Sequence, residues 1–216
     1  ALFYFLFDDN SVTIETLAGE KRQLELPDAS VVVVNALSQI SYSSDSWEDN
    51  RIIELEGEAF FDVTKGNSFD VKTPAGTVSV LGTEFNVKQR TDFFEVKCFE
   101  GSVQVVSPTQ EKILKAGEHF RLSGNRLELG QNDYPEPQWT NNISSFRNLP
   151  LIEVMAELER QYAIDVNMSE TTGKILFTGG FEHGDLENAL ESITEPLDLS
   201  FKFETTNQVS IHPREQ

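Results

Sequence analysis

The chain has 216 residues, with 17 Lys and Arg against 36 Asp and Glu, and a formal net charge of −19. A chain of this length forms one or two domains and buries roughly 70% of its unfolded surface. The charge excludes nucleic acid and anionic lipid as partners, because both require a basic face. The plain interpretation is a soluble acidic globular protein, and the sharper one is that it meets a basic partner surface.

The single cysteine and the three histidines leave little scope for metal or thiol chemistry. Cys98 cannot form an intramolecular disulfide, and it lies on the apolar phase of an alternating segment, which predicts a buried structural thiol. No two of His119, His183 and His212 have the i, i+4 spacing of a helical zinc site. We expect His119 and His212 to lie on strands near the surface. The sequence predicts no metal and no cofactor.

The longest apolar run is Ala1–Phe7, far short of the roughly 20 residues that a membrane-spanning helix needs. It does not have the features of a signal peptide. We expect it to form either a first strand or the chain just after a membrane segment.

Residues 1–130 alternate apolar and polar side chains in short runs, which is the pattern of half-buried strands. Turn residues, for example Pro27-Asp28 and Gly124-Asn125, separate the runs. This region is therefore predicted to be all-β, as a sandwich, a barrel or a solenoid-like stack. The inward-facing positions are Leu24, Leu26, Ala59, Phe61, Val63, Phe69, Val71, Val78, Val80, Phe85, Val87, Phe94, Val96, Cys98, Val103, Val105, Phe120, Leu122, Leu127 and Leu129.

The alternation changes phase at Gly82 and again at Gly101. A slip of one residue reverses the face that is buried, so each glycine is predicted to mark a bulge or a corner. These glycines are interpreted as architectural rather than as part of a ligand-binding loop.

After a polar linker over residues 131–143, the pattern becomes helical. Asn148 is predicted to cap a first helix with Pro150 in its first turn, and Asp185 to cap a second helix that stops at Pro196. Gly179–Gly184 is interpreted as a turn. The apolar stripes of the two helices are Leu151, Val154, Met155, Leu158 and Tyr162, then Leu186, Ala189, Leu190 and Ile193.

The two helical segments belong to an internal repeat. A shift of 35 residues places Phe146 on Phe181 and Leu151 on Leu186, with five further matches in register. Each copy is predicted to be a βαβ unit, and a closing hairpin adds a last strand. The fold class is therefore mainly β with a small α+β part: an all-β domain over residues 1–130, a linker over 131–143, and a βαβ-βαβ domain over 144–216.

Catalytic motifs are not evident. Glu54, Glu56 and Glu58 alternate along one strand, which indicates a solvated face rather than a glycosidase carboxylate pair. No serine lies in a Gly-x-Ser-x-Gly elbow, and the glycine-rich Gly179–Gly184 lacks the Lys-Ser/Thr of a P-loop. The sequence does not predict an enzyme.

Several segments form an ordered series of motifs. They are Gly19-Glu20-Lys21, Leu26-Pro27-Asp28-Ala29-Ser30, Asn35-Ala36 with Ser38, Leu55-Glu56-Gly57-Glu58-Ala59-Phe60-Phe61-Asp62-Val63, Val80-Leu81-Gly82-Thr83-Glu84-Phe85-Asn86-Val87, Glu100-Gly101-Ser102-Val103 and Ala116-Gly117-Glu118. In this order they resemble the FecR-like domain of bacterial anti-sigma factors. The family usually has Gly where Ala29 stands and often where Leu37 stands. Because Ala tolerates positive φ poorly, we expect the first turn to differ in type.

The C-terminal part resembles the domain that is paired with FecR in Bacteroidetes-type proteins. The resemblance rests on Phe146-Arg147-Asn148, Pro150-Leu151, Glu157–Tyr162 and Phe177-Thr178-Gly179. That domain is in turn similar to the short N-terminal domain of secretins and TonB-dependent receptors, which agrees with the duplicated βαβ unit.

The resemblance implies a signalling module without catalytic residues. This chain would be the periplasmic part of an inner-membrane anti-sigma factor. It would bind the N-terminal signalling domain of an outer-membrane TonB-dependent receptor. The membrane helix and the cytoplasmic segment that binds an extracytoplasmic-function sigma factor would lie outside this chain. The motif residues are interpreted as structural: Asp28, Gly57, Glu58, Phe61, Val63, Gly82, Thr83, Phe85 and Gly101.

One route to partner binding is strand addition at an exposed sheet edge. The last strand, Gln208–His212, is a candidate edge through Gln208, Val209, Ser210 and Ile211, and the open alternative is that this strand is covered within the protein. A runner-up function is a periplasmic carbohydrate-binding or cell-envelope structural protein, which would need exposed aromatic platforms from Trp47 or Trp139. A hydrolase that uses acidic residues is a third reading.

Overall fold

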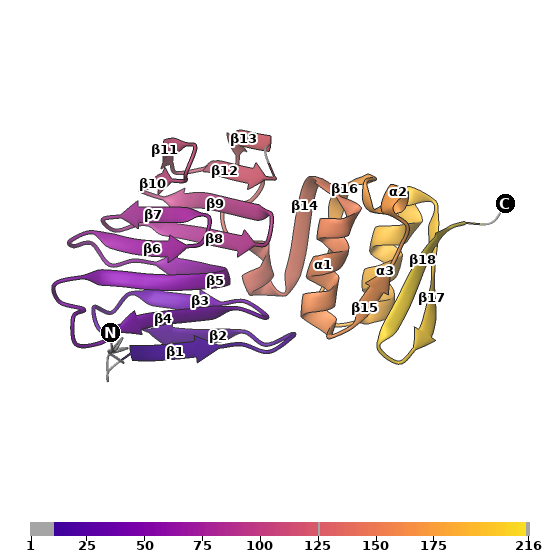
Figure 1. Ribbon diagram of the computed structural model, residues 1–216, viewed down its shortest axis with the longest axis horizontal. Helices are drawn as coiled ribbons and strands as arrows, with labels where there is room; N and C mark the ends of the chain where they lie inside the picture. Colours follow the sequence, from indigo (N-terminus) through magenta and orange to yellow (C-terminus); the bar gives the residue numbers. More distant parts are fainter. Residues whose placement is uncertain (1–10, 125, 215–216) are drawn as a thin grey trace, which may run out of the picture. The chain divides into compact units, whose positions relative to one another are not determined.

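The computed structural model describes residues 11–124 and 126–214 (Figure 1). The apolar run Ala1–Phe7 and Asn125 of the predicted turn lie outside the described residues. The chain forms two compact units. The first consists of the residues up to Thr16 and of Lys21–Glu136, and the second of Leu17–Glu20 and Pro137–Gln216.

In the described part of the first unit, the alternating sequence forms one 13-stranded sheet. Short runs of Val, Phe and Thr suit a pleated surface that is buried on one side. The strands are β1 (Ser11–Glu15), β2 (Arg22–Glu25), β3 (Val31–Val34), β4 (Gln39–Ser43), β5 (Arg51–Asp62), β6 (Phe69–Thr73), β7 (Gly76–Val80), β8 (Glu84–Arg90), β9 (Phe93–Glu100), β10 (Ser102–Val106), β11 (Glu111–Lys115), β12 (Glu118–Ser123) and β13 (Arg126–Gln131).

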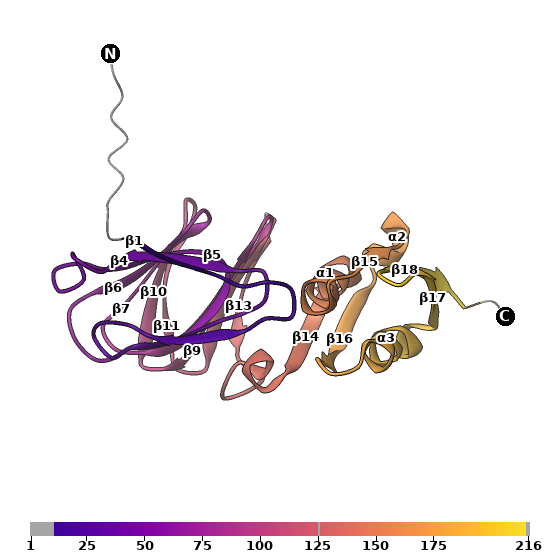
Figure 2. The same cartoon turned by 90° about the horizontal axis from the view of Figure 1, so that it is seen from below.

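The long strand β5 divides this sheet into two halves. Its first residues pair with β4 and β6, and its later residues pair with β3 and β8. The first half-sheet is therefore β1-β4-β5-β6-β7-β10-β11, and the second half-sheet is β2-β3-β5-β8-β9-β12-β13. Both halves contribute to one apolar core, so the sheet is curled like a half-barrel (Figure 2).

The predicted phase changes are corners between the two half-sheets. The chain leaves the first half-sheet at Gly82, between β7 and β8, and returns at Gly101, between β9 and β10. Gly101 has φ 76°, a conformation that residues with a Cβ rarely adopt. The corner interpretation of both glycines is confirmed.

The core of the first unit is aromatic and aliphatic. Phe61 on β5 stacks on Phe85 on β8, with 5.0 Å between the ring centroids, and both side chains are fully buried. Cys98 is also fully buried, as predicted, and burial raises the pKa of its thiol to about 11. The thiol is therefore protonated and closed to solvent at neutral pH.

The turn that was expected to differ keeps its left-handed geometry. Ala29 has φ 63° and Leu37 has φ 46°, the region that favours glycine. The expectation of a different turn type is therefore wrong. Backbone hydrogen bonds explain why the geometry persists, because Ala29 N donates to the carbonyl of Leu26 at 2.9 Å and Leu26 N donates to that of Ser30 at 2.8 Å.

The second unit contains the predicted repeat. Its elements are η1 (Gln138–Asn141), β14 (Ile143–Pro150), α1 (Leu151–Tyr162), β15 (Asp165–Asn167), α2 (Glu170–Gly173), β16 (Leu176–Glu182), α3 (Leu186–Thr194), η2 (Glu195–Leu197), β17 (Leu199–Thr205) and β18 (Gln208–Pro213). The first strands of the two copies, β14 and β16, pair with each other, and the second strands, β15 and β17, both pair with β18. The helices α1 and α3 lie between the two sheets (Figure 1).

Helix α3 follows the sequence prediction closely. Asp185 caps it by accepting hydrogen bonds from the backbone N–H groups of Glu187 and Asn188 at 2.9 and 3.1 Å. Ala189, Leu190 and Ile193 are buried.

Helix α1 begins differently from the prediction. Asn148 does not cap it but lies in β14 with φ 52°, and Pro150 is the residue before the helix. Gly179–Glu182 belongs to strand β16 rather than to a turn. The predicted linker contains the end of β13 and the short helix η1, in which Trp139 is buried.

Candidate partner-binding site

The last strand, β18, is not an edge strand. It lies between β15, which pairs in parallel through Gln208–Ser210, and β17, which pairs antiparallel along its length. Val209 and Ile211 are buried. The prediction that Gln208–Ile211 offers an exposed edge is therefore wrong. The sequence does not show that β15 covers this edge, because the parallel partner β15 lies some 40 residues earlier in the chain.

The edges of this three-stranded sheet are β15 and β17. Strand β17 is the longer one, and it becomes more exposed from Leu199 toward Thr205. Phe203 is 43% exposed, and its ring lies edge-on to that of Phe201 at 5.7 Å. A strand with one unpaired edge beside an exposed aromatic side chain is the arrangement that strand addition requires, since the backbone gives affinity and the side chain gives selectivity.

The first unit holds its motif residues in a buried polar network around Glu58. This carboxylate is 4% exposed and accepts hydrogen bonds from Asn35 Nδ2 and Asn86 Nδ2, both at 3.0 Å. Lys88 Nζ lies 3.2 Å from Glu58 Oε2. Glu54 and Glu56 are exposed as predicted, but Glu58 is not on a solvated face, so that part of the prediction is wrong.

Strand β5 bends at Gly57, where it packs closely against Ser38. The φ of Gly57 is 112°, and a Cβ there would lie 2.7 Å from the backbone Cα of Ser38. Ser38 Oγ in turn accepts the N–H of Glu58 at 3.0 Å. Gly57 and Glu58 thus fix the point at which β5 passes from one half-sheet to the other.

The remaining motif residues join neighbouring segments. Arg51 forms an ion pair with Asp28 at 2.7 Å. Burial alone would raise the pKa of the Asp28 carboxyl. Hydrogen bonds from Arg51 and Ser30 outweigh burial and hold this pKa below the usual range. Thr83 exchanges two backbone hydrogen bonds with Val63, and its Oγ1 donates to the carbonyl of Ser102 at 3.1 Å. These contacts join neighbouring segments of the first unit, and a structural role for the motif residues stays a prediction.

The Glu58 network continues as a row of alternating charges across five strands. The strand registers place Glu58 beside Lys88, Lys88 beside Glu95, Glu95 beside Arg121, and Arg121 beside Glu128. We call this row the charge ladder. Arg121 Nε lies 2.6 Å from Glu95 Oε2. Burial alone would raise the pKa of Glu95, but the positive charges of Lys97 and Arg121 hold it at about 2.

His119 lies at the side of the charge ladder and is buried rather than near the surface, which corrects the prediction for this residue. Its Nε2 lies 3.9 Å from Glu128 Oε1, and the ring packs over Gly130. Burial lowers the pKa of His119, so the ring is neutral at pH 7. His212 is exposed, and His183 shares a 2.8 Å hydrogen bond with Ser144 Oγ.

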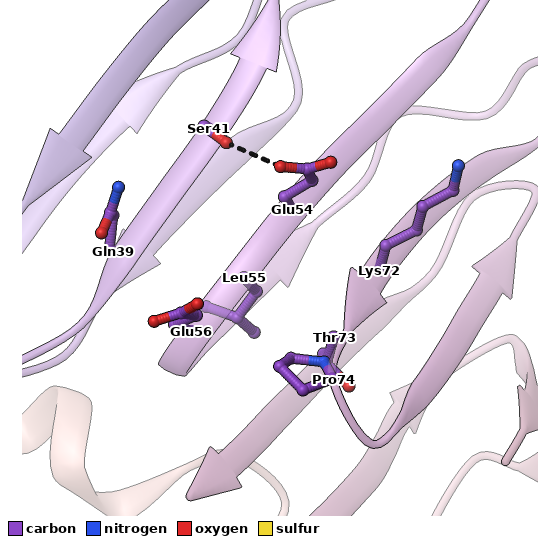
Figure 3. A pocket seen from close by; sticks show the side chains of 8 residues that line it. All are labelled: Gln39, Ser41, Glu54, Leu55, Glu56, Lys72, Thr73 and Pro74. Atoms are coloured by element: carbon purple, nitrogen blue, oxygen red, sulfur yellow. Dashed lines mark hydrogen bonds between the residues drawn. The ribbon is translucent and has the colours of Figure 1, made fainter. Parts of the chain in front are cut away.

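A groove crosses the outer face of the first half-sheet (Figure 3). One hollow of about 300 Å³ lies between Gln39 on β4, Glu56 on β5 and Pro74 after β6. A second hollow of about 270 Å³ adjoins it, and Ser41 and Glu54 line both. The groove is thus polar and open to solvent.

Neither tryptophan forms an exposed platform. Trp47 is 2% exposed and Trp139 is 6% exposed. These two rings therefore do not support the alternative function of a carbohydrate-binding protein. Within residues 11–124 and 126–214, no helix is long and apolar enough to cross a membrane, and no group of three or more His, Cys, Asp and Glu side chains could hold a metal ion.

Comparison with known proteins assigns both units. Residues 12–104 match the model of the FecR protein family, and residues 143–211 match that of the FecR C-terminal region. The chain belongs to the FecR family. It is similar to two crystal structures, each of a candidate anti-sigma factor from Parabacteroides distasonis, with 27% identity and a TM-score of 0.85 to both. The alignments cover 95% and 94% of this chain and 100% of the other chains. No curated protein sequence matches.

This FecR-family chain therefore carries the sensor region of a FecR-type anti-sigma factor. The family is regulatory and is not known for enzymatic activity. The FecR match extends from β1 into β10 and includes the Glu58 network. The C-terminal match extends from β14 into β18 and includes the free edge of β17.

Sequence reasoning missed Phe203 and the charge ladder of this FecR-family chain. A signal for the ladder is present, because Lys88, Glu95 and Arg121 occupy the polar phase of their strands with alternating sign. Only the strand order β5-β8-β9-β12-β13 places them side by side. The exposed position of the Phe203 ring depends on its place on the edge strand β17, which the sequence alone does not show.

Proposed function

We propose that this chain is the periplasmic sensor part of an anti-sigma factor that is anchored in the inner membrane. It binds the N-terminal signalling domain of an outer-membrane TonB-dependent receptor, and so relays substrate status to an extracytoplasmic-function sigma factor. Membership of the FecR family supports the role in signalling. Residues 1–130 and 144–216 form its two domains, joined through residues 131–143.

The observation that carries the proposal is the unpaired edge of β17 next to the exposed ring of Phe203. A partner strand pairs with β17 and extends the three-stranded sheet, and Phe203 packs against a side chain of that strand. Pairing through the backbone fits a partner of similar βαβ architecture, since such a domain offers a sheet edge of its own.

The test is a calorimetric titration of this chain with the isolated signalling domain of the TonB-dependent receptor encoded beside it. We expect saturable 1:1 binding. Phe203→Asp places a charge in the interface and is expected to weaken binding at least about tenfold, because a buried aromatic anchor contributes about 2 kcal/mol or more. Leu176→Asp, at a residue that is 51% exposed on β16, is the matched control.

The possible results separate two failures. If the wild-type chain neither releases heat nor co-elutes with the domain, the proposed partner is wrong. If it binds but Phe203→Asp and Leu176→Asp bind equally well, the partner is right and β17 is not the site. In that case the edge of β15 is the next strand to alter.

A further inference from the structure

The groove on the outer face of the first half-sheet is built from side chains that the strand registers place next to one another. Ser41 on β4 lies opposite Glu54 on β5, and Gln39 lies opposite Glu56. On the other side of β5, Glu54 lies opposite Lys72 on β6. Because directly opposed residues point to the same face, these polar groups lie on one face of three neighbouring strands (Figure 3).

Most of this polar capacity is unused within the described chain. Ser41 Oγ donates a long hydrogen bond of 3.4 Å to Glu54 Oε2. The side chains of Gln39, Glu56 and Lys72 form no hydrogen bond or ion pair with another described residue. The groove therefore offers free acceptors, a free donor and an amide that does both.

This mixture of groups selects among ligand classes. Glu54 and Glu56 repel phosphate and other anions, and Lys72 opposes the binding of a basic peptide. Ligands that are purely apolar gain little from such a polar lining. A sugar fits, because each of its hydroxyl groups donates and accepts a hydrogen bond, and because carboxylates, amides and ammonium groups supply complementary partners.

The second hollow adds further hydroxyl and amide groups. Ser11 and Ser43 line it together with Asn50. A serine hydroxyl and an asparagine amide both donate and accept hydrogen bonds, as sugar hydroxyl groups do. Since the two hollows share Ser41 and Glu54, a ligand that fills both is elongated.

We propose that this groove binds a neutral linear oligosaccharide that spans both hollows, with Glu54 in contact with two adjacent sugar rings. The site belongs to the first unit and uses none of the residues of β17. It is therefore a second binding activity, and its existence does not depend on the receptor partner proposed above.

The test is binding of the purified chain to an array of neutral linear di- to hexasaccharides derived from glucans, xylan, mannan and chitin. Any hit is titrated by calorimetry with the wild-type chain, Glu54→Ala and Glu191→Ala. Glu191 is exposed on α3 in the second unit, so its removal changes the net charge equally. We expect Glu54→Ala to bind at least about tenfold more weakly, since a charged acceptor forms stronger hydrogen bonds than a neutral one. Glu191→Ala is expected to bind as the wild type does.

Three results would overturn the proposal. The first is that no oligosaccharide on the array binds the wild-type chain. The second is that a sugar binds Glu54→Ala as tightly as the wild type, which places its site elsewhere. The third is that oligolysine binds, the sugars do not, and Glu54→Ala removes that binding, because the groove is then a site for a basic peptide. Equal melting temperatures of the two variants exclude a loss of fold as the cause.

Discussion

At the scale of single residues, Ala29 holds a conformation that costs free energy. A left-handed backbone costs a residue with a Cβ about 1–2 kcal/mol, and glycine avoids this cost. A glycine at position 29 would therefore stabilise the folded chain, but part of this stabilisation is lost because glycine is more flexible in the unfolded chain. We expect Ala29→Gly to raise the free energy of unfolding by about 0.5–1 kcal/mol, measured by urea denaturation. Ala156→Gly in the middle of α1 should do the reverse and cost about 1 kcal/mol.

The protonation of Glu95 makes the stability of the first unit depend on pH. Its pKa is about 2 in the folded chain, below the ordinary value of 4.5, because Lys97 and Arg121 outweigh the effect of burial. A carboxyl with a lowered pKa stabilises the fold fully above pH 4.5, and this contribution is lost as the pH falls toward 2. Glu95→Gln removes the closer of the two carboxylates that pair with Arg121, at 2.6 Å, and leaves Glu128 at 3.4 Å. Because hydrogen bonds between charged groups are lost, it is expected to cost about 1.5–3 kcal/mol at pH 7.

The measurement for Glu95 is urea denaturation of both proteins at a series of pH values. The difference between wild type and Glu95→Gln should shrink as the pH falls below 4.5. A difference that stays constant down to pH 2 would show that the variant acts through packing and not through charge. Glu191→Gln on the exposed face of α3 is the control and should have little effect at any pH.

At the scale of elements, the bend in β5 decides how the sheet curls. Gly57 has φ 112°, and a Cβ would meet Ser38 at distances that no ordinary contact has. We expect Gly57→Ala to lower the free energy of unfolding by more than about 2 kcal/mol, since backbone strain and a backbone clash act together. Gly184→Ala is the matched control, because its Cβ would have no neighbour within 4 Å. If thermal melting shows the two variants to be equally stable, the bend does not depend on the glycine.

At this scale, some features of the fold could be predicted from the sequence and others could not. Alternation with a period of two predicted the strands and the corners at Gly82 and Gly101, because those features depend on neighbours in the chain. The burial of Glu58 was not predicted. Alternation tells which residues share a face, but Asn35 and Asn86, which cover this carboxylate, come from other strands. The sequence left open whether strand β18 is an edge or is covered within the protein for the same reason, since its partner β15 is distant in sequence.

At the scale of the whole molecule, the net charge of −19 affects how fast partners associate. A field of one sign attracts an oppositely charged partner over distances comparable to the Debye length, which is about 10 Å at 0.1 M salt. If the signalling domain meets this chain through a basic surface, the association rate constant should fall roughly tenfold or more as NaCl rises from about 0.05 to about 0.5 M.

The dissociation rate constant should change much less over the same range, because it depends on the short-range contacts at β17 rather than on the long-range field. Stopped-flow fluorescence or surface plasmon resonance separates the two constants. Phe203→Asp should mainly raise the dissociation rate constant at every salt concentration. The reverse pattern, with an association rate constant that does not respond to salt, would show that the acidic charge of the chain serves another purpose than attracting this partner.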